Sequence, residues 1–200
     1  MKKILIFLGL IQSFIIFSQE GIIIPLDPPV EYDIPNGTYV QDMNFDFFPY
    51  IGTWEGNWGL GINNKTFTLK IEKINHHLIS YPYGRYYYQD LLIGKYTITE
   101  TISGNVISST MSIMDVNLAK LSSIGNSLVS NRCYFVYSDP NLCDVTGTVI
   151  LLRDLTNINT LLYKFLQSEI WIENDCPYKG DPNGIPIPIP TQMVTLTKVN

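Results

Sequence analysis

In the stretch Lys65 to Glu72, polar and apolar side chains alternate strictly from Thr66 onward. In an extended strand, Phe67, Leu69 and Ile71 share one face, and the polar residues between them share the other. A strand with one buried face requires this period of two, whereas an amphipathic helix repeats about every 3.6 residues. The stretch therefore predicts a strand in a sheet that has one face against an apolar core and the other in water.

The composition of the whole chain also favours strands over helices. Hydrophobic residues make up 46% of the chain and charged residues only 16%, and tyrosine, threonine, isoleucine and valine are frequent. These residue types suit pleated, half-buried surfaces. Alanine, the best helix former, is nearly absent and occurs as Ala119 alone. We therefore expect an all-β fold.

Further short apolar or alternating runs follow at the spacing expected of a barrel. We expect strands at residues 53–58, 83–88, 94–102, 106–111, 131–137, 145–152, 161–172 and 192–199, in addition to 65–72. Residues 161–172 also fit one face of a helix, and we prefer a strand because β-branched and aromatic residues continue to the end of this stretch. Residues 115–126 are either a loop or a short helix capped by Asp115. About eight to ten strands predict a closed, antiparallel, up-and-down β-barrel.

Residues 1–18 have the pattern of a secretory signal peptide. Lys2 and Lys3 precede an apolar run from residue 4 to residue 17, which is shorter than the roughly 18 residues that a transmembrane helix needs. We place the cleavage after Ser18. The mature protein is then exported, to the periplasm or the medium, with no stable membrane insertion after the signal is removed.

The mature chain has the length of one domain. Cleavage leaves 200 − 18 = 182 residues. Residues 19–49 are rich in proline, which fixes the backbone and favours extended chain and turns. We therefore expect an extended proline-rich lead-in at 19–49 and a monomeric antiparallel β-barrel domain at 50–200.

Acidic residues outnumber basic ones in the mature chain. The full chain has 13 Lys and Arg and 18 Asp and Glu, so removal of Lys2 and Lys3 leaves 13 − 2 = 11 basic residues and a formal charge of 11 − 18 = −7. Such a chain repels phosphate backbones. We therefore expect no nucleic-acid partner.

Three cysteines, Cys133, Cys143 and Cys176, lie in a chain with an export signal, where one pair can form a disulfide. A loop at residues 136–140 would set Cys133 opposite Cys143 on neighbouring strands, and we prefer this pair. Three buried thiols are the alternative.

The stretch Tyr50-Ile51-Gly52-Thr53-Trp54 resembles the first-strand signature of the calycins, that is, the lipocalins and fatty-acid-binding proteins. The resemblance implies an up-and-down barrel with a small-molecule cavity, in which Trp54 closes the bottom. Lipocalins set an arginine of the last strand against this tryptophan, and here Lys198 is the residue available for that cation–π contact. Residues 59–64 are too short a link for the two helices that fatty-acid-binding proteins place after the tryptophan.

Most of the mature chain is also similar to a family of small exported bacterial proteins of unknown function. The likeness lies in the end of the signal at residues 17–19, the Gly-Thr-Trp start, residues 91–96 and the closing residues 190–198. It implies export but no particular activity.

No constellation of catalytic or metal-binding residues is apparent in the sequence. His76 and His77 are adjacent, so on a strand they point to opposite faces and would not hold one ion. Residues 42–46 begin like a calcium loop, but Phe47 takes the glycine position and Thr53 the place of the closing glutamate. A serine triad would have to use one of the two histidines, and no Gly-x-Ser-x-Gly elbow occurs. We therefore expect no metal, no cofactor and no enzymatic activity.

Aromatic residues supply the candidate binding site. Five tyrosines crowd into residues 81–88, and such rings offer a large apolar area with a polar tip. The candidate ligand-binding residues are Trp54, Trp58, Tyr83, Arg85 and Tyr87. Packing of these rings in the core and at the rim of the barrel is the alternative.

These observations predict a non-catalytic binding protein that holds a small apolar or amphipathic ligand inside its barrel. The alternative is a structural or interaction protein whose barrel is filled by its own side chains and whose aromatic surface contacts a protein or a glycan. An interior cavity of roughly 300 Å³ or more would favour the carrier.

Overall fold

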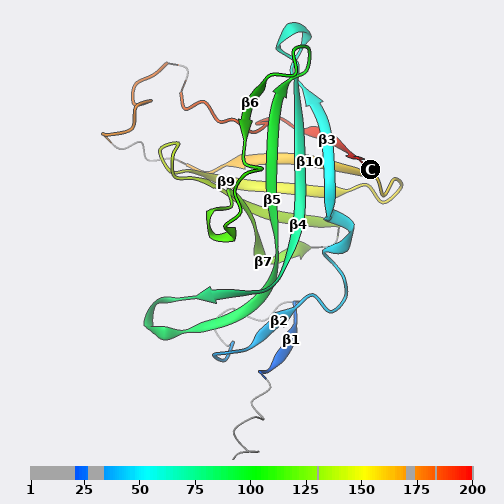
Figure 1. Cartoon of the computed structure of the whole chain (residues 1–200), viewed down its shortest axis with the longest axis vertical. Coiled ribbons are helices and arrows are strands. Elements are labelled where there is room, and N and C mark those ends of the chain that lie inside the picture. The colour runs from blue at the N-terminus through cyan, green and yellow to red at the C-terminus, as the bar shows by residue number, and fades with distance from the viewer. Residues whose placement is uncertain (1–20, 27–33, 130, 170–173, 183, 200) are drawn as a thin grey trace, which may run out of the picture.

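The computed structural model describes residues 21–26, 34–129, 131–169, 174–182 and 184–199. Strands dominate this part of the chain (Figure 1), and its helices are short 3-10 turns. The strands are β1 (Ile23–Pro25), β2 (Tyr39–Gln41), β3 (Gly52–Trp58), β4 (Lys65–Ser80), β5 (Tyr86–Glu100), β6 (Val106–Ser109), β7 (Leu121–Val129), β8 (Arg132–Asp139), β9 (Val145–Arg153), β10 (Thr160–Gln167) and β11 (Val194–Val199). The 3-10 turns are η2 (Phe48–Tyr50), η3 (Gly61–Asn63), η4 (Pro82–Gly84) and η5 (Val116–Leu118).

Eight strands close into an antiparallel barrel in the order β3, β4, β5, β7, β8, β9, β10 and β11. The last strand returns to the first, with Lys198 opposite Trp54. The seam between β5 and β7 is short and close: Gly94 lies opposite Leu121, and a Cβ on this glycine would lie 3.0 Å from the leucine side chain. Because successive barrel strands are neighbours throughout, the structure confirms the predicted all-β, up-and-down barrel.

The barrel interior is filled by its own side chains. Phe67 of β4 meets Tyr163 of β10 with 5.1 Å between ring centroids, although β3 and β11 separate these strands in the sheet. Tyr137 of β8 meets Phe165 of β10 across β9 at 5.6 Å. A Cβ added to Gly147 would lie 2.4 Å from the Phe165 ring. The rings therefore pack against each other across the interior as in a protein core.

Trp54 lies inside this core, with none of its side chain exposed. Its indole Nε1 donates a hydrogen bond to the backbone oxygen of Tyr50 at 2.8 Å. The Lys198 Nζ atom lies 5.2 Å from the centre of the ring, which is the cation–π contact for which the sequence offered this lysine.

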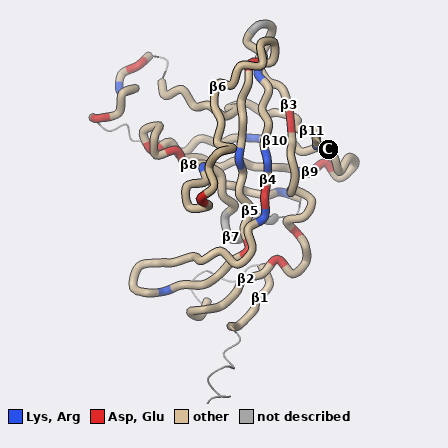
Figure 2. Tube along the Cα trace, in the orientation of Figure 1, with Lys and Arg blue, Asp and Glu red and all other residues tan. Residues whose placement is uncertain are grey.

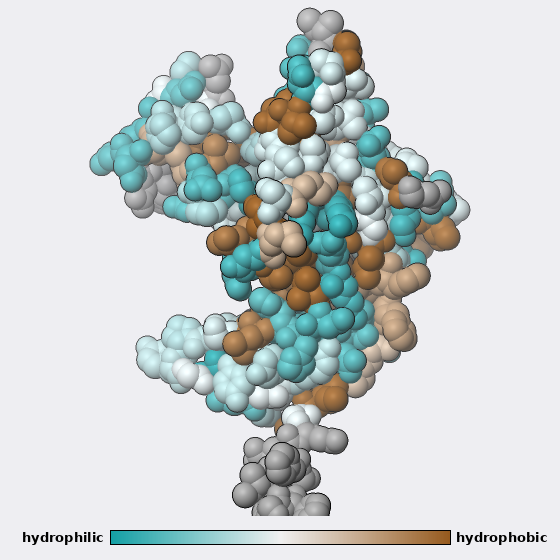
Figure 3. Space-filling model, in the orientation of Figure 1, coloured by the Kyte–Doolittle hydropathy of each residue, from teal (hydrophilic) through white to brown (hydrophobic). Residues whose placement is uncertain are grey.

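The described parts of the lead-in add two short strands to the sheet. β1 pairs with β2 and β2 with β5, both in parallel, so that the order at this edge is β1-β2-β5-β4. We call this part the extension: β1, β2, residues 77–80 of β4 and residues 86–90 of β5. Figure 1 shows it at the lower end of the molecule, and Figure 3 shows that it projects from the barrel as a separate arm.

The two faces of the extension differ because side chains alternate along each strand. Val40 and Tyr87 on one face are buried in the same cluster as the barrel core. Tyr39, Tyr86 and Tyr88 point to the other face and are partly or largely exposed. The first face thus anchors the extension, and the second is left open.

A one-residue bulge marks the point where β4 leaves the barrel. Ile74 pairs with Leu91, but the next pair is His77 with Gln89, so β4 uses three residues where β5 uses two. His76, inside the bulge, has a φ of 55°. Bulges bend the strand that carries them, and in Figure 1 the β4–β5 ribbon turns sideways as it leaves the barrel.

Two predictions of secondary structure need correction. Residues 83–88 and 94–102 are not separate strands, because one strand, β5, runs from Tyr86 to Glu100 and Tyr83 belongs to the turn η4. The stretch 115–126, expected to be a loop or a short helix, contains both η5, capped by the Asp115 side chain, and the first half of β7. Residues 161–172 form a strand as far as Gln167, and residues 170–172 lie outside the described part.

The predicted disulfide between Cys133 and Cys143 is wrong. Cys143 is bonded to Cys176, with 5.5 Å between their Cα atoms. Cys133 is fully buried on β8, on the same face as Phe135 and Tyr137. Since it points into the barrel, it cannot reach Cys143 in the loop after β8.

Candidate functional site

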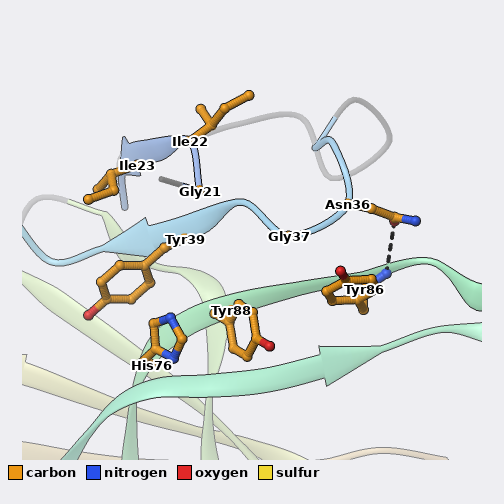
Figure 4. Close-up of a pocket in the computed structure, with 9 residues that line it drawn as sticks. All are labelled: Gly21, Ile22, Ile23, Asn36, Gly37, Tyr39, His76, Tyr86 and Tyr88. Atoms are coloured by element: carbon orange, nitrogen blue, oxygen red, sulfur yellow. Dashed lines mark hydrogen bonds between the residues drawn. The ribbon is translucent and has the colours of Figure 1, made fainter. Parts of the chain in front are cut away.

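An open groove of about 1080 Å³ lies on the exposed face of the extension, outside the barrel (Figure 4). It is lined by Gly21, Ile22, Ile23, Asn36, Gly37, Tyr39, His76, Tyr86 and Tyr88. We call this the groove. Figure 4 shows its aromatic rings on β2, β4 and β5, with Ile22 and Ile23 across from them at β1.

Strand register brings these residues together. Ile23 on β1 lies opposite Tyr39 on β2, which lies opposite Tyr88 on β5, so all three form one row across the sheet. Tyr86 lies two residues from Tyr88 and therefore points to the same side. The bulge of β4 places His76 beside this row.

Four rings form a continuous series in the groove. The His76 ring stacks on Tyr88 with 4.0 Å between centroids and an interplanar angle of 14°. Tyr39 meets His76 edge-on at 4.7 Å, and Tyr86 meets Tyr88 edge-on at 6.2 Å. Such pairs are favourable geometries for aromatic side chains. The groove therefore has a pre-formed aromatic floor with hydroxyl and imidazole groups at its edges.

A buried carboxylate, Asp90, holds one end of the floor. One of its oxygens accepts hydrogen bonds from the Tyr39 hydroxyl at 2.5 Å and from the His76 backbone N–H at 3.1 Å. The other accepts from the Asp42 backbone N–H at 3.2 Å and pairs with the Lys73 ammonium at 2.9 Å. Asp90 thus ties β2, the bulge of β4 and β5 to one point.

Asp42 completes this ionic network. It is buried, and its carboxylate pairs with Lys73 at 3.1 Å. It also accepts hydrogen bonds from the backbone N–H groups of Asp46 at 2.8 Å and Phe47 at 3.4 Å. Because each oxygen of Asp42 and Asp90 already accepts from a donor, these carboxylates are built to hold structure rather than to transfer protons.

The network shifts the titration of its members. Burial raises the pKa of Asp90, but hydrogen bonds from Tyr39, Lys73 and two backbone amides outweigh it, so that this pKa lies below its ordinary value. Burial and then the bond to Asp90 raise the pKa of Tyr39 to about 12. Burial lowers the pKa of Lys73, but its pairing with Asp90 and Asp42 raises that pKa overall.

Acid is expected to weaken the protein through Asp90. The folded-state pKa lies below that of the unfolded chain, so ionised Asp90 stabilises the fold above the unfolded value of about 3.9, and this is lost as the pH falls through the folded-state value. Urea unfolding between about pH 6 and about pH 2 should show the decline. Glu72 and Asp154 also have lowered pKa values. The variant Asp90→Asn isolates the contribution of Asp90, and an identical pH profile in that variant would contradict the assignment.

The structure does not bring the five predicted ligand-binding residues together. Trp54 is inside the core, and Trp58 is half-buried at the barrel rim, 6.2 Å from Phe67 and with Lys65 over its ring. None of the five lines the groove.

The other three lie at the far end of the β4–β5 hairpin. Tyr83 is fully exposed in the turn η4, with a φ of 69°, and Arg85 follows it as an exposed residue. Tyr87 is buried on the anchored face, where it stacks on Tyr81 at 6.0 Å. The tyrosine cluster does contribute to the groove, but through Tyr86 and Tyr88.

Two further properties concern metals and membranes. Within the described ranges, no three His, Cys, Asp or Glu side chains gather into a set that could hold a metal ion. The same part of the chain contains no helix with the length and apolar character needed to cross a membrane.

Comparison with protein families gives one match. A family of unknown function, DUF6705, matches over residues 1–199, almost the whole chain. The chain belongs to this family. The comparisons with curated proteins and with solved structures give no match. The family supports the resemblance to proteins of unknown function, and the calycin resemblance remains a prediction from a few residues.

Proposed function

We propose that this protein is an exported, monomeric, non-catalytic binding protein that holds a small amphipathic ligand in the groove. One contrast carries the proposal: the barrel interior is filled by rings that meet across it, whereas an aromatic floor lies open on the extension. Sequence alone favoured a ligand inside the barrel. Because the rings of Phe67 and Tyr163 are in contact inside the barrel and occupy that space, the groove outside the barrel is the better candidate for the binding site.

Other features support the remaining parts of the proposal. Export is supported by the signal pattern of residues 1–18 and by the Cys143–Cys176 disulfide, which suits an oxidising compartment. A non-catalytic role is supported by the engagement of Asp42 and Asp90 in hydrogen bonds and ion pairs.

A second candidate function is an interaction protein that contacts another protein or a glycan. Tyr83 favours it, because this ring is fully exposed at the tip of a projecting hairpin in a left-handed conformation that bulky residues rarely adopt. In that case the side-chain-filled barrel is a scaffold for the hairpin.

Native mass spectrometry of the protein purified from its own host tests the proposal. We expect a small molecule to copurify with the wild type and with Tyr83→Ser, and to be lost from Tyr88→Ser. The two variants match in chemistry and differ in place, since Tyr88 lines the groove and Tyr83 does not. A bound protein or glycan that is lost only from Tyr83→Ser would favour the second candidate. A small molecule retained by Tyr88→Ser would overturn the groove as its site.

A further inference from the structure

We infer that the groove takes a cationic ligand, a small alkylammonium whose charged head lies against the aromatic floor. The inference rests on the proposed function and specifies the ligand class of the same site. It follows from the charges around the groove, from its lining and from the rings themselves.

The segment that builds one wall of the groove is purely acidic in its charged residues. Residues 19–49 supply β1 and β2 and contain no lysine or arginine. In its described part, residues 21–26 and 34–49, the charged residues are Asp42 and Asp46. In Figure 2 the loop that leaves β2 carries acidic positions, in red, and no basic one. Negative charge close to a groove raises the local concentration of ligands of the opposite sign.

The ionic network at the end of the floor also carries an excess negative charge. Asp42 and Asp90 contribute two negative charges and Lys73 one positive charge, so that the sum is −2 + 1 = −1. Both carboxylates are almost fully buried, where solvent screens charge less than at the surface. Asp90 accepts a hydrogen bond from the Tyr39 hydroxyl, so this charge lies at the hydroxyl edge of one ring of the floor.

The side chains that line the groove include no lysine or arginine, so they leave room for a cationic ligand. None of the nine lining residues is Asp, Glu, Lys or Arg. An anionic ligand would meet no lysine or arginine side chain among these lining residues. A cation can approach the rings of Tyr39, Tyr86 and Tyr88, whose π faces attract positive charge.

The wall at β1 suits the alkyl part of such a ligand. Ile22 and Ile23 are 56% and 53% exposed, which is unusual for isoleucine. Figure 4 shows them at β1, beyond β2 from the rings of His76 and Tyr88. Apolar side chains at one edge of the groove, next to aromatic rings that lie close to a negative charge, fit an alkyl chain with an ammonium head.

Calorimetric titration with three probes of equal chain length tests the ligand class: hexyltrimethylammonium, hexanol and hexyl sulfate. We expect the ammonium to bind about tenfold more tightly than hexanol, as cation–π contacts allow, and hexyl sulfate to bind least. Added salt should lower the affinity for hexyltrimethylammonium and leave the affinity for hexanol unchanged. Tyr88→Leu keeps an apolar side chain but removes the ring. In this variant the affinity for hexyltrimethylammonium should fall close to the affinity for hexanol.

Two controls keep the result interpretable. Tyr83→Leu makes the same change outside the groove and should leave all three affinities unchanged. If Tyr88→Leu fails to fold by circular dichroism, Tyr86→Leu replaces it, because Tyr86 is more exposed.

The outcomes separate this inference from the proposed function. Equal binding of hexanol and hexyltrimethylammonium overturns the cationic ligand but leaves a groove that binds amphiphiles. If no probe binds, yet a molecule copurifies in a Tyr88-dependent way, the ligand class is again wrong and the groove stands. If no probe binds and nothing copurifies, both fail. Binding of a lysine-rich peptide without binding of hexyltrimethylammonium shows a macromolecular partner and overturns the small ligand.

Discussion

Replacement of Asp90 by alanine is expected to lower the free energy of unfolding by about 4 kcal/mol. The change leaves the Tyr39 hydroxyl and the His76 backbone N–H without their acceptor and removes one of the two carboxylates that pair with Lys73. The buried backbone N–H of Asp42 also loses its acceptor, and an unsatisfied buried donor beside a charge that loses a partner is costly. Urea unfolding followed by circular dichroism measures the loss.

Glu55→Ala is the matched control for this prediction. Glu55 is an exposed residue on β3, and its carboxylate accepts a long hydrogen bond from the Thr68 hydroxyl at 3.4 Å. Its loss should change the free energy of unfolding by no more than about 0.5 kcal/mol. Similar effects of the two variants would show that the Asp90 network is not the anchor of the extension.

The single variant Trp54→Ala is also expected to lower the free energy of unfolding by about 4 kcal/mol. The change removes the largest fully buried side chain of the core, the hydrogen bond to Tyr50 and the contact with Lys198. The cavity would open beside the β3–β11 pairing that closes the barrel. Thermal and urea unfolding should both report the loss.

Trp58→Ala tests whether position rather than residue type decides the effect. Trp58 lies four residues along the same strand but is only half-buried at the rim. We expect this variant to lose about 1 kcal/mol, since less apolar area returns to water. A larger loss for Trp58→Ala than for Trp54→Ala would refute the assignment of Trp54 as the centre of the core.

The barrel could be predicted from the sequence because most of its strands bury only one face. Alternation at 65–72 corresponds to the first half of β4, where Phe67, Leu69 and Ile71 are buried. Residues 89–94 of β5 are all buried and show no period of two, so the sequence suggested a break between two strands there. β7 is rich in serine, glycine and asparagine, which are typical of loops, and it was missed for that reason.

The groove was less predictable, because it depends on register between distant segments. The crowded tyrosines were recognised from the sequence, and alternation along β5 places Tyr86 and Tyr88 on the face opposite Tyr87. Which face is open depends on the docking of β2 against β5, and no local pattern shows that pairing. His76 enters the groove through a bulge, and bulges leave little trace in a sequence.

The disulfide shows the same limit. Cys133 and Cys143 are close in sequence, and proximity along the chain favoured their pairing. The actual partner, Cys176, is 33 residues from Cys143 and belongs to the long segment between β10 and β11. Only the direction of Cys133, inward on β8, excludes the nearer pair.

The bulge of β4 shifts the register between β4 and β5 by one residue where these strands pass from the barrel into the extension. With uniform pairing beyond Ile74, His77 would lie opposite Tyr88 and Leu78 opposite Tyr87, so the second half of β4 would present its other side. The additional residue sets the observed match of Leu78 with Tyr88 and Ser80 with Tyr86. The bulge therefore determines which residues of β4 share a face with Tyr86 and Tyr88.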